Sequence, residues 1–190
     1  MKISKNYIII YFIILVAIAS RFVPHMVNLS AITAIGIFSA VYLTKKEAIG
    51  ITLIARLVSD LFLGFFSWPL MVAVYLSHLA GIVFGLWIKK SNELNGGQTF
   101  TRWAKIIFSG FGSAFVFYIV TNFVAFYPEF YPQNISGLIA SYANGLPFLR
   151  GTLVGDVGYT IALFGTFALV KSLANIRAKK VTMNPNFSLK

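Results

Sequence analysis

The chain has 190 residues, of which 58% are hydrophobic and only 11% are charged, a composition too apolar for a soluble domain of this size. It contains no cysteine, which excludes a disulfide framework, a thiol nucleophile and a Cys-ligated metal. The formal net charge of +11 comes from basic residues in short segments between apolar runs, a pattern that indicates membrane orientation rather than nucleic-acid binding.

Six apolar runs follow one another along the chain. Each is long enough, or nearly long enough, to cross a bilayer, which takes about 20 residues and at least roughly 17. In chain order, the predicted spans are 7–23, 29–44, 48–66, 69–88, 103–126 and 151–173, the second being the shortest. We therefore expect residues 1–173 to form a single all-α transmembrane domain, a six-helix bundle, and residues 174–190 to form a basic cytoplasmic tail.

Lysine and arginine predict the orientation of these spans. Thirteen of the 16 lie at the amino end, between the second and third runs, between the fourth and fifth runs, and at the carboxyl end. Six spans put these four segments on one side, which the positive-inside rule identifies as the cytoplasm. We expect a multi-pass protein of the cell (inner or plasma) membrane. The first run, with Ala17-Ile18-Ala19, also fits a cleavable signal peptide, whose removal would leave the other spans unchanged.

Ionisable residues within the predicted spans mark candidate sites, because charge inside a bilayer is costly and needs a partner. Arg56 and Asp60 lie one helical turn apart, which favours a structural ion pair, with a direct ligand role for Asp60 as the alternative. Asp156, near the start of the sixth run, is expected to pair in the same way with Arg150 or Arg21. Most of these side chains belong to the outer half of the bundle.

His78 shares the fourth run with Gly81 and Gly85, small residues whose spacing of four makes a flat strip for close helix packing. We therefore expect His78 to be an interior hydrogen-bonding residue rather than a ligand. Two alternatives for function stay open at this point. One is an intramembrane enzyme that uses Asp60 and His78, and the other is a stand-alone ion-coupled transporter in which Asp60 or Asp156 titrates.

The segments expected on the outer side are rich in aromatic and amide side chains. Trp and Tyr at this level are typical of the interfacial belt, but His25, Asn28 and Asn144 are not belt residues. The segment 127–150 is long, and within it Ile135 to Asn144 is expected to form a short helix that covers the outer face as a lid. An aromatic and amide-lined cavity under such a lid suits capture of a small organic molecule.

The residues predicted to bind substrate share a polar or aromatic side chain and a place toward the outer face. They are His25, Asn28, Asp60, Trp68, Asn122, Tyr142, Asn144, Arg150 and Asp156. The chain lacks the sequence motifs of a zinc-protease helix, a nucleophile elbow, a P-loop and a dinucleotide-binding fingerprint. We therefore expect that the protein is not an enzyme and that it binds no cofactor, no resident metal and no nucleic acid.

Four stretches of the sequence carry a resemblance to known membrane proteins. They are Arg21-Phe-Val-Pro-His25 with Asn28, Ser59-Asp60-Leu-Phe-Leu-Gly64, Thr121-Asn122-Phe123, and the stretch from Ala143 to Asp156. Together they resemble an uncharacterised bacterial membrane-protein family, which in turn is similar to the substrate-binding S components of energy-coupling factor (ECF) vitamin transporters, including cobalamin-binding members. The resemblance implies six helices, cytoplasmic termini and an outward-facing cup, built by spans 4 to 6, that takes up a small vitamin or cofactor precursor.

The same resemblance points to a substrate and to partners. If the substrate is cobalamin, His25 is the one plausible cobalt ligand on the outer face. The partners implied are the lipid bilayer and an ECF-type transmembrane coupling subunit with its ATPases. S components typically present an Ala-x-x-x-Ala strip on span 1 to that subunit, whereas here Ala17, Ala19 and Ser20 lie out of that register. This departure leaves the energy source of the expected uptake open.

Overall fold

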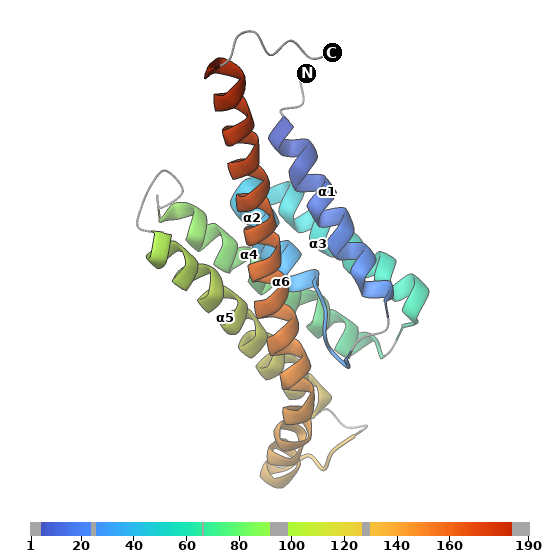
Figure 1. The fold of residues 1–190 in the computed structure, drawn as a ribbon. Coiled ribbons are helices and arrows are strands. Elements are labelled where there is room, and N and C mark those ends of the chain that lie inside the picture. The colour runs from blue at the N-terminus through green and yellow to red at the C-terminus, as the bar shows by residue number, and fades with distance from the viewer. Residues whose placement is uncertain (1–4, 24–25, 66, 92–98, 127–129, 184–190) are drawn as a thin grey trace.

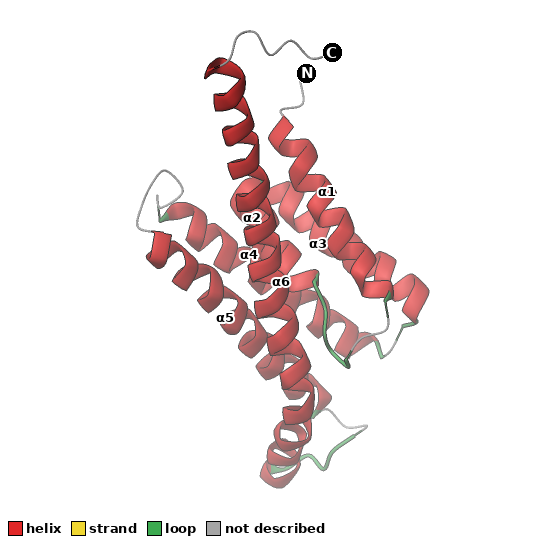
Figure 2. Ribbon diagram, in the orientation of Figure 1, coloured by secondary structure: helices red, strands yellow, loops and turns green. Residues whose placement is uncertain are grey.

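The computed structural model describes residues 5–23, 26–65, 67–91, 99–126 and 130–183. These residues form six α-helices and one short 3₁₀ helix and contain no strand (Figure 2), so the predicted all-α class is confirmed. The elements are α1 (Lys5–Ala19), η1 (Ser20–Phe22), α2 (Ile32–Tyr42), α3 (Lys45–Leu63), α4 (Trp68–Lys90), α5 (Thr99–Ala125) and α6 (Ile135–Met183).

The helices run back and forth between two ends of an elongated bundle (Figure 1). The start of α1, the turn between α2 and α3 and the end of α6 lie toward one end, which we call the termini end. The η1 helix and the connections from α3 to α4 and from α5 to α6 lie toward the other, which we call the far end. Each predicted run corresponds to one helix, in the predicted order.

Three helices of the described chain are long and apolar enough to cross a membrane, by length and composition. They are Trp68–Lys90, Phe100–Ala125 within α5 and Ile135–Arg177 within α6. Two further apolar helices, Asn6–Phe22 and Ile32–Tyr42, are shorter. The structure therefore supports a membrane protein with three such helices, fewer than the six spans that the sequence predicted.

Helix α2 occupies the centre of the bundle. Its residues 32–41 are all buried, and it packs against α1, α3, α4, α5 and α6. With 11 residues at about 1.5 Å each, it covers roughly half of a hydrocarbon core about 30 Å thick. Only residues 32–42 of the predicted span 29–44 are α-helical. An apolar run looks the same in sequence whether protein or lipid surrounds it, and here protein does.

The close approach of α4 to α2 depends on glycine. A Cβ at Gly81 would lie 2.7 Å from the carbonyl oxygen of Thr33, and one at Gly85 would collide with the carbonyl of Ile37. The small-residue strip on α4 thus brings the two backbones together, as such strips do in membrane helices. Because His78 lies one turn before Gly81 on the same helix face, this contact also brings its ring to α2.

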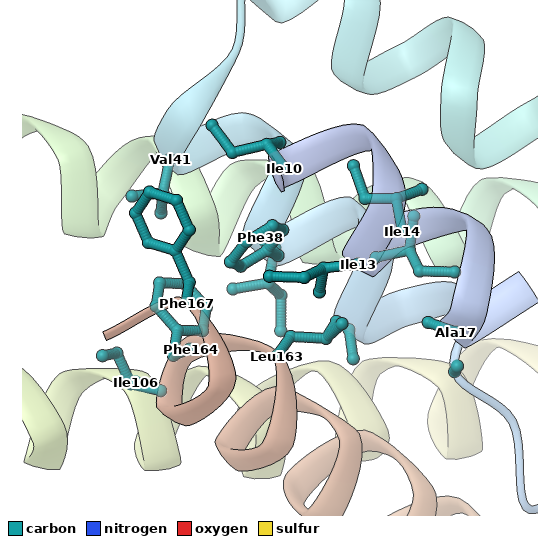
Figure 3. Close-up of a cluster of buried hydrophobic side chains, with 14 of the residues drawn as sticks. Ile10, Ile13, Ile14, Ala17, Phe38, Val41, Ile106, Leu163, Phe164 and Phe167 are labelled. Atoms are coloured by element: carbon teal, nitrogen blue, oxygen red, sulfur yellow. The ribbon is translucent and has the colours of Figure 1, made fainter. Parts of the chain in front are cut away.

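An apolar cluster joins α1, α2 and α6, together with Ile88 of α4 and Ile106 of α5 (Figure 3). The ring of Phe38 at its centre meets that of Phe164 edge-on, with 5.3 Å between centroids, and that of Phe167 at 5.9 Å. Isoleucines of α1, among them Ile10 and Ile13, pack beside these rings. In a bilayer such a cluster is stabilised by close van der Waals contact, because lipid tails are as apolar as the side chains that they would replace.

Helix α3 begins at a capping box. The Thr44 hydroxyl accepts a hydrogen bond from the Glu47 amide at 3.3 Å, and the Glu47 carboxylate accepts one from the Thr44 amide at 2.8 Å. The bond from the Thr44 amide is the main reason that the pKa of the Glu47 carboxyl lies below its usual value. The Tyr11 hydroxyl donates to the same carboxylate at 3.1 Å, so the box also ties α1 to α3.

Helix α6 differs most from its prediction. The sequence predicted a short lid helix, a separate span 151–173 and a tail from residue 174, whereas the structure has one helix, Ile135–Met183. The tail residues 174–183 are therefore helical. Pro147 lies inside this helix and leaves the carbonyl of Ala143 without its usual N–H donor, yet the helix continues through it.

Hydrogen bonds between α5 and α6 hold the first turns of α6 in place. The Ser141 hydroxyl donates to the Asn122 carbonyl, and the Tyr118 hydroxyl donates to the Tyr142 carbonyl, both at 2.6 Å. Gly145 lies directly against the Asn122 side chain, where a Cβ would collide. Tertiary packing thus overrides the proline as a helix boundary, and the predicted lid is instead a wall fixed to α5.

Candidate functional site

A pocket of about 460 Å³ lies toward the far end of the bundle, and we call it the far-end pocket. Its walls come from η1, the segment between η1 and α2, α3, α4, α5, the connection after α5, and α6. The lining residues are Arg21, Asn28, Arg56, Leu70, Val74, Phe117, Thr121, Asn122, Ala125, Tyr131, Asn144, Gly145 and Phe148. Segments far apart in the sequence therefore build one concave site.

The structure brings three of the nine predicted substrate residues together in this lining. They are Asn28, Asn122 and Asn144. Five others lie outside the lining, namely Asp60, Trp68, Tyr142, Arg150 and Asp156. The ninth, His25, lies outside the described residues.

The five residues outside the lining are placed there for different reasons. Trp68 is 75% exposed at the start of α4, and Arg150 is exposed on α6. Asp60 and Asp156 are buried inside the bundle. The Tyr142 hydroxyl donates to the carbonyl of Ile119 on α5 at 3.0 Å. The sequence predicted only the depth of these residues in the membrane. Whether a side chain reaches the pocket depends on the face of the helix from which it leaves.

Arg21 holds the segment between η1 and α2 against the bundle. Its guanidinium donates from Nε to the Ser59 hydroxyl of α3 at 3.0 Å and from Nη1 to the Leu29 carbonyl at 3.3 Å. Asn28 in this segment has a φ of 60°, a left-handed conformation that asparagine adopts more readily than most residues. The turn thereby carries Asn28 to the pocket wall.

Helix α6 accepts the same segment through two glycines. A Cβ at Gly151 would collide with the carbonyl of Val27, and one at Gly155 would lie 2.8 Å from the backbone nitrogen of Ser30. The small-residue pair on α6 therefore lets non-helical backbone lie directly on the helix. This contact sits immediately before Asp156 in the sequence.

Arg56 and Asp60 form an ion pair, as their spacing suggests. Arg56 Nε donates to Asp60 Oδ2 at 2.9 Å and Nη2 lies 2.6 Å from Oδ1, a two-point contact between two buried side chains. The Arg56 side chain also lines the pocket, and its guanidinium carbon lies 5.9 Å from the centroid of the Tyr75 ring. Asp60 thus neutralises a pocket arginine rather than lining the pocket itself.

Asp156 does not form the ion pair with Arg150 or Arg21 that was expected. It is buried and makes no salt bridge within the described chain, and the Thr33 hydroxyl of α2 lies near its carboxyl. Arg150 precedes it by six residues, a rotation of about 240° around a helix, so the two side chains leave α6 on different faces. Arg21 donates instead to α3 and to its own segment.

The opposite wall of the pocket is built from α5 and α6. Asn122 donates from Nδ2 to the Tyr118 carbonyl at 2.8 Å, and Asn144 donates from Nδ2 to the Tyr131 hydroxyl at 3.3 Å. Each amide is oriented by one internal hydrogen bond and has further donor and acceptor capacity. Phe117 of α5 and Phe148 of α6 add apolar surface beside these groups.

His78 lies beneath the floor of the pocket. Its Nδ1 is 2.8 Å from the Thr33 hydroxyl, and its ring centroid is 5.2 Å from that of Phe117, which lines the pocket together with Val74. His78 is therefore an interior hydrogen-bonding residue. Asp60 and His78 hydrogen-bond to different partners, so the contacts of the described residues do not assemble the pair that the intramembrane-enzyme alternative requires.

Two arginines, Arg21 and Arg56, belong to the lining, and Arg56 forms an ion pair with Asp60. Charge acts more strongly here than in water, because the surroundings have a low dielectric constant. Within the described ranges no group of three or more His, Cys, Asp or Glu side chains could hold a metal ion. The guanidinium groups can donate charge-assisted hydrogen bonds to an anionic group.

A second cavity, also of about 460 Å³, lies between α1 and α6. Aliphatic side chains dominate its lining, including Ile9, Ile13, Val16 and Leu163. A small-molecule site needs a few convergent polar groups to fix the orientation of its ligand. The far-end pocket has such groups from several helices, so it is the better candidate.

Sequence reasoning missed several lining residues, of which Phe117, Thr121 and Tyr131 bring the most surface or polarity. A signal for two of them was present, because Phe117, Thr121 and Ala125 recur every four residues and so share a face of α5. Tyr131 carries no such signal, since it lies in the connection between α5 and α6. The two arginines were recognised as ionisable but were not predicted to line a site.

Comparison with known proteins adds one finding. Residues 1–179 match the model of a family described as a family of unknown function, DUF6580. The match covers every residue of the far-end pocket. No curated protein and no solved structure matches the chain.

Proposed function

We propose that this chain, which belongs to the family of unknown function DUF6580, is the substrate-binding membrane subunit of an uptake system for a small anionic vitamin or cofactor precursor. The observation that carries the proposal is the far-end pocket, with two arginines, three asparagines and an apolar floor. The protein performs no chemistry on its substrate and serves to capture it for passage across the membrane.

The size and the lining of the pocket support a small-molecule ligand. Its volume of about 460 Å³ falls within the range of roughly 300–1,000 Å³ typical of ligand pockets. Leu70, Val74 and Phe117 supply apolar surface for affinity, and the asparagine amides supply a few hydrogen bonds for orientation. A corrinoid is larger than the drug-sized molecules that such a volume suits, so we favour a smaller vitamin over cobalamin.

Charge narrows the substrate class further. A carboxylate or phosphate would accept charge-assisted hydrogen bonds from a guanidinium, whose planar fork matches both groups. Asp60 holds the Arg56 guanidinium in a defined position, which reduces the entropy that binding would cost.

We assign the termini end to the cytoplasm and the far-end pocket to the outer face. Lysine pairs at the start of α3 and at the end of α4 mark the termini end, as the positive-inside rule expects of a cytoplasmic face. Six crossings then require the segment before α2 to complete the second span, because α2 alone is too short. The contacts of that segment with Gly151 and Gly155 support this, since non-helical backbone at membrane depth must be shielded by protein.

Uptake against a gradient needs an energy source, and we propose a partner for it. The chain carries no P-loop, so an ECF-type transmembrane coupling subunit with its ATPases is the partner that the resemblance to S components suggests. The small residues of span 1 lie out of the Ala-x-x-x-Ala register. If α1 docks to the coupling subunit, we therefore expect other side chains to make the contact.

Binding by the purified protein tests this function. The full chain in detergent micelles is mixed with a panel of water-soluble vitamins and precursors that carry a carboxylate or phosphate, and the melting temperature is recorded, because a ligand of the folded state raises it. We expect at least one compound to stabilise the wild type. Arg21→Gln should bind that compound roughly 10–100-fold more weakly, through loss of a charged hydrogen bond.

Two further variants control this experiment. Arg150→Gln removes a positive charge from an exposed position outside the pocket and should bind like the wild type. Asn144→Ala changes an exposed pocket amide with little risk to folding and should weaken binding. If no compound raises the melting temperature and native mass spectrometry detects no co-purified small molecule, the proposal is wrong.

A stand-alone ion-coupled transporter is a second candidate, which one observation favours. Asp156 is buried, and its Oδ2 atom has no hydrogen-bond partner in the described part of the chain. Carboxyl groups of this kind within a membrane often bind the coupling ion. Asp60 suits this role less, because it is held by Arg56. This candidate predicts that liposomes containing the chain alone take up substrate when a pH gradient is imposed.

A further inference from the structure

Three polar side chains from three helices meet inside the bundle, below the floor of the far-end pocket. The Thr33 hydroxyl of α2 lies 2.8 Å from Nδ1 of His78 on α4 and also neighbours the carboxyl of Asp156 on α6. The exposed fractions of Thr33, His78 and Asp156 are only 1%, 3% and 2%. All three side chains are therefore enclosed by the bundle, and Thr33 contacts the imidazole directly.

Within this group, Asp156 and His78 each have a buried polar atom without a further partner. Asp156 Oδ2 and His78 Nε2 are buried, and neither has a hydrogen-bond partner among the described residues. The hydroxyl of Thr160, one turn after Asp156 on the same face of α6, is in the same situation. Buried polar atoms of folded proteins are nearly always satisfied, so each of these unsatisfied atoms needs an explanation.

The charges that face this group favour a proton as its ligand. Arg56 of α3, already in its ion pair, and Arg21 of η1 are the charged groups that act on His78, while α2 contributes Thr33 and α5 contributes the uncharged ring of Phe117. These arginines disfavour a second cation such as sodium. Asp156 makes no salt bridge within the described chain. Burying a carboxylate in this way is costly, and protonation removes that cost.

We propose that Asp156, Thr33 and His78 form a buried proton relay in which the proton is stored on Asp156. A hydroxyl both donates and accepts, and a neutral imidazole carries its hydrogen on either nitrogen. In the protonated relay, the Asp156 carboxylic acid donates to the Thr33 hydroxyl, which donates to Nδ1 of His78, and Nε2 carries the hydrogen. In the deprotonated relay, Nδ1–H of His78 donates to Thr33, which donates to the Asp156 carboxylate. One proton enters or leaves at Nε2, and the atoms balance.

The position of the relay links it to the pocket. The His78 ring packs against Phe117, and Val74, one turn earlier on α4, lines the same floor. Positive charge on the pocket arginines opposes an added proton below them, so an anion bound above favours proton uptake. By thermodynamic reciprocity the proton then favours the anion to the same extent. This linkage rests on the proposed function, whereas the relay itself does not.

Infrared spectroscopy of the full chain in lipid nanodiscs tests the stored proton. An uncharged carboxylic acid has a C=O stretching band that a carboxylate lacks, and the wild-type-minus-variant difference spectrum isolates it. We expect the band to disappear in Asp156→Asn and to shift in frequency in Thr33→Val, which loses the hydroxyl partner. Glu47→Gln, which removes an exposed carboxylate, is the matched control and should retain it. A wild type without the band, or a band that persists in Asp156→Asn, overturns the relay.

Nitrogen NMR tests the other end of the relay. The chain has two histidines, so His25→Gln leaves His78 as the single ring signal in protein labelled with ¹⁵N-histidine. We expect the tautomer with hydrogen on Nε2, and conversion to the Nδ1–H tautomer as the medium is made alkaline. Adding Asp156→Asn, whose amide mimics the acid, should abolish that conversion. A tautomer that does not depend on Asp156 contradicts the relay. Neither measurement uses a substrate, so failure here leaves the pocket proposal intact.

Discussion

The apolar cluster of α1, α2 and α6 and the polar region around the far-end pocket are built from the same helices. Along α6, Phe164 of the cluster follows Asp156 of the relay by eight residues, and along α2, Phe38 follows Thr33 by five. In the cluster, each contact is one of many similar ones, and lipid or another side chain can replace it. In the polar region, each group needs one particular partner, and removing that partner leaves a buried charge or donor behind. We therefore expect the polar region to be the more sensitive to single substitutions.

The largest effect is expected from breaking the ion pair of α3. Asp60→Asn leaves the Arg56 guanidinium buried without its counter-charge, and it should lower the free energy of unfolding by about 3–5 kcal/mol. The double variant Arg56→Met with Asp60→Leu should lose less, because no buried charge remains. Unfolding by SDS in mixed micelles, followed by circular dichroism, measures both values. A double variant less stable than Asp60→Asn would show that the pair itself, rather than an isolated charge, dominates.

A smaller effect is expected in the apolar cluster. Phe164→Ala removes a buried ring from its contact with Phe38 and should cost about 3 kcal/mol, the low end of what buried Phe→Ala changes cost in soluble cores. The low end applies because lipid supplies much of the lost apolar surroundings. Phe164→Leu should cost far less. The same SDS unfolding measures all variants, and ligand affinity should not change. Equal losses for Leu and Ala would contradict the view that the cluster tolerates replacement.

The smallest effect is expected at the capping box of α3, outside the apolar runs. The pKa of Glu47 is lower in the folded protein than its usual value of 4.5, so its charge stabilises the fold above that pH, and the stabilisation is lost as the pH falls through the folded-state value. Glu47→Gln should lower the melting temperature slightly near neutral pH and should flatten the decline on acidification. Melting curves from about pH 7 down to about pH 3 measure this. Identical acid slopes for both proteins would show that the box contributes nothing.

Sequence patterns predicted the elements that depend on local chemistry. The order of the six helices follows from the apolar runs, and the Arg56–Asp60 contact follows from a spacing of four residues on one helix. The interior place of His78 followed from its small neighbours, which allow close packing. In each case the interaction joins residues within a few turns of one another, so the pattern contains it.

The same patterns failed where a distant segment decides the outcome. The length of α2 and the continuity of α6 through Pro147 depend on packing against other helices, which no local window contains. The composition of the far-end pocket likewise depends on packing between helices. Asn28, Asn122 and Asn144 reach the pocket, whereas Asp60 and Asp156 turn into the bundle, and only the rotation of each helix against its neighbours decides between these outcomes.

The sequence by itself determined the class of this protein, because the hydrophobic composition and the grouping of lysines and arginines are properties of the chain that need no partner to express them. It also determined which polar residues require an explanation. Only the tertiary structure decided that α2 is enclosed by other helices, that two arginines line one pocket, and that the Thr33 hydroxyl meets the His78 ring. The physical reason is that contacts between helices depend on their relative rotation and depth, which apolar periodicity leaves undefined when a helix is apolar on every side.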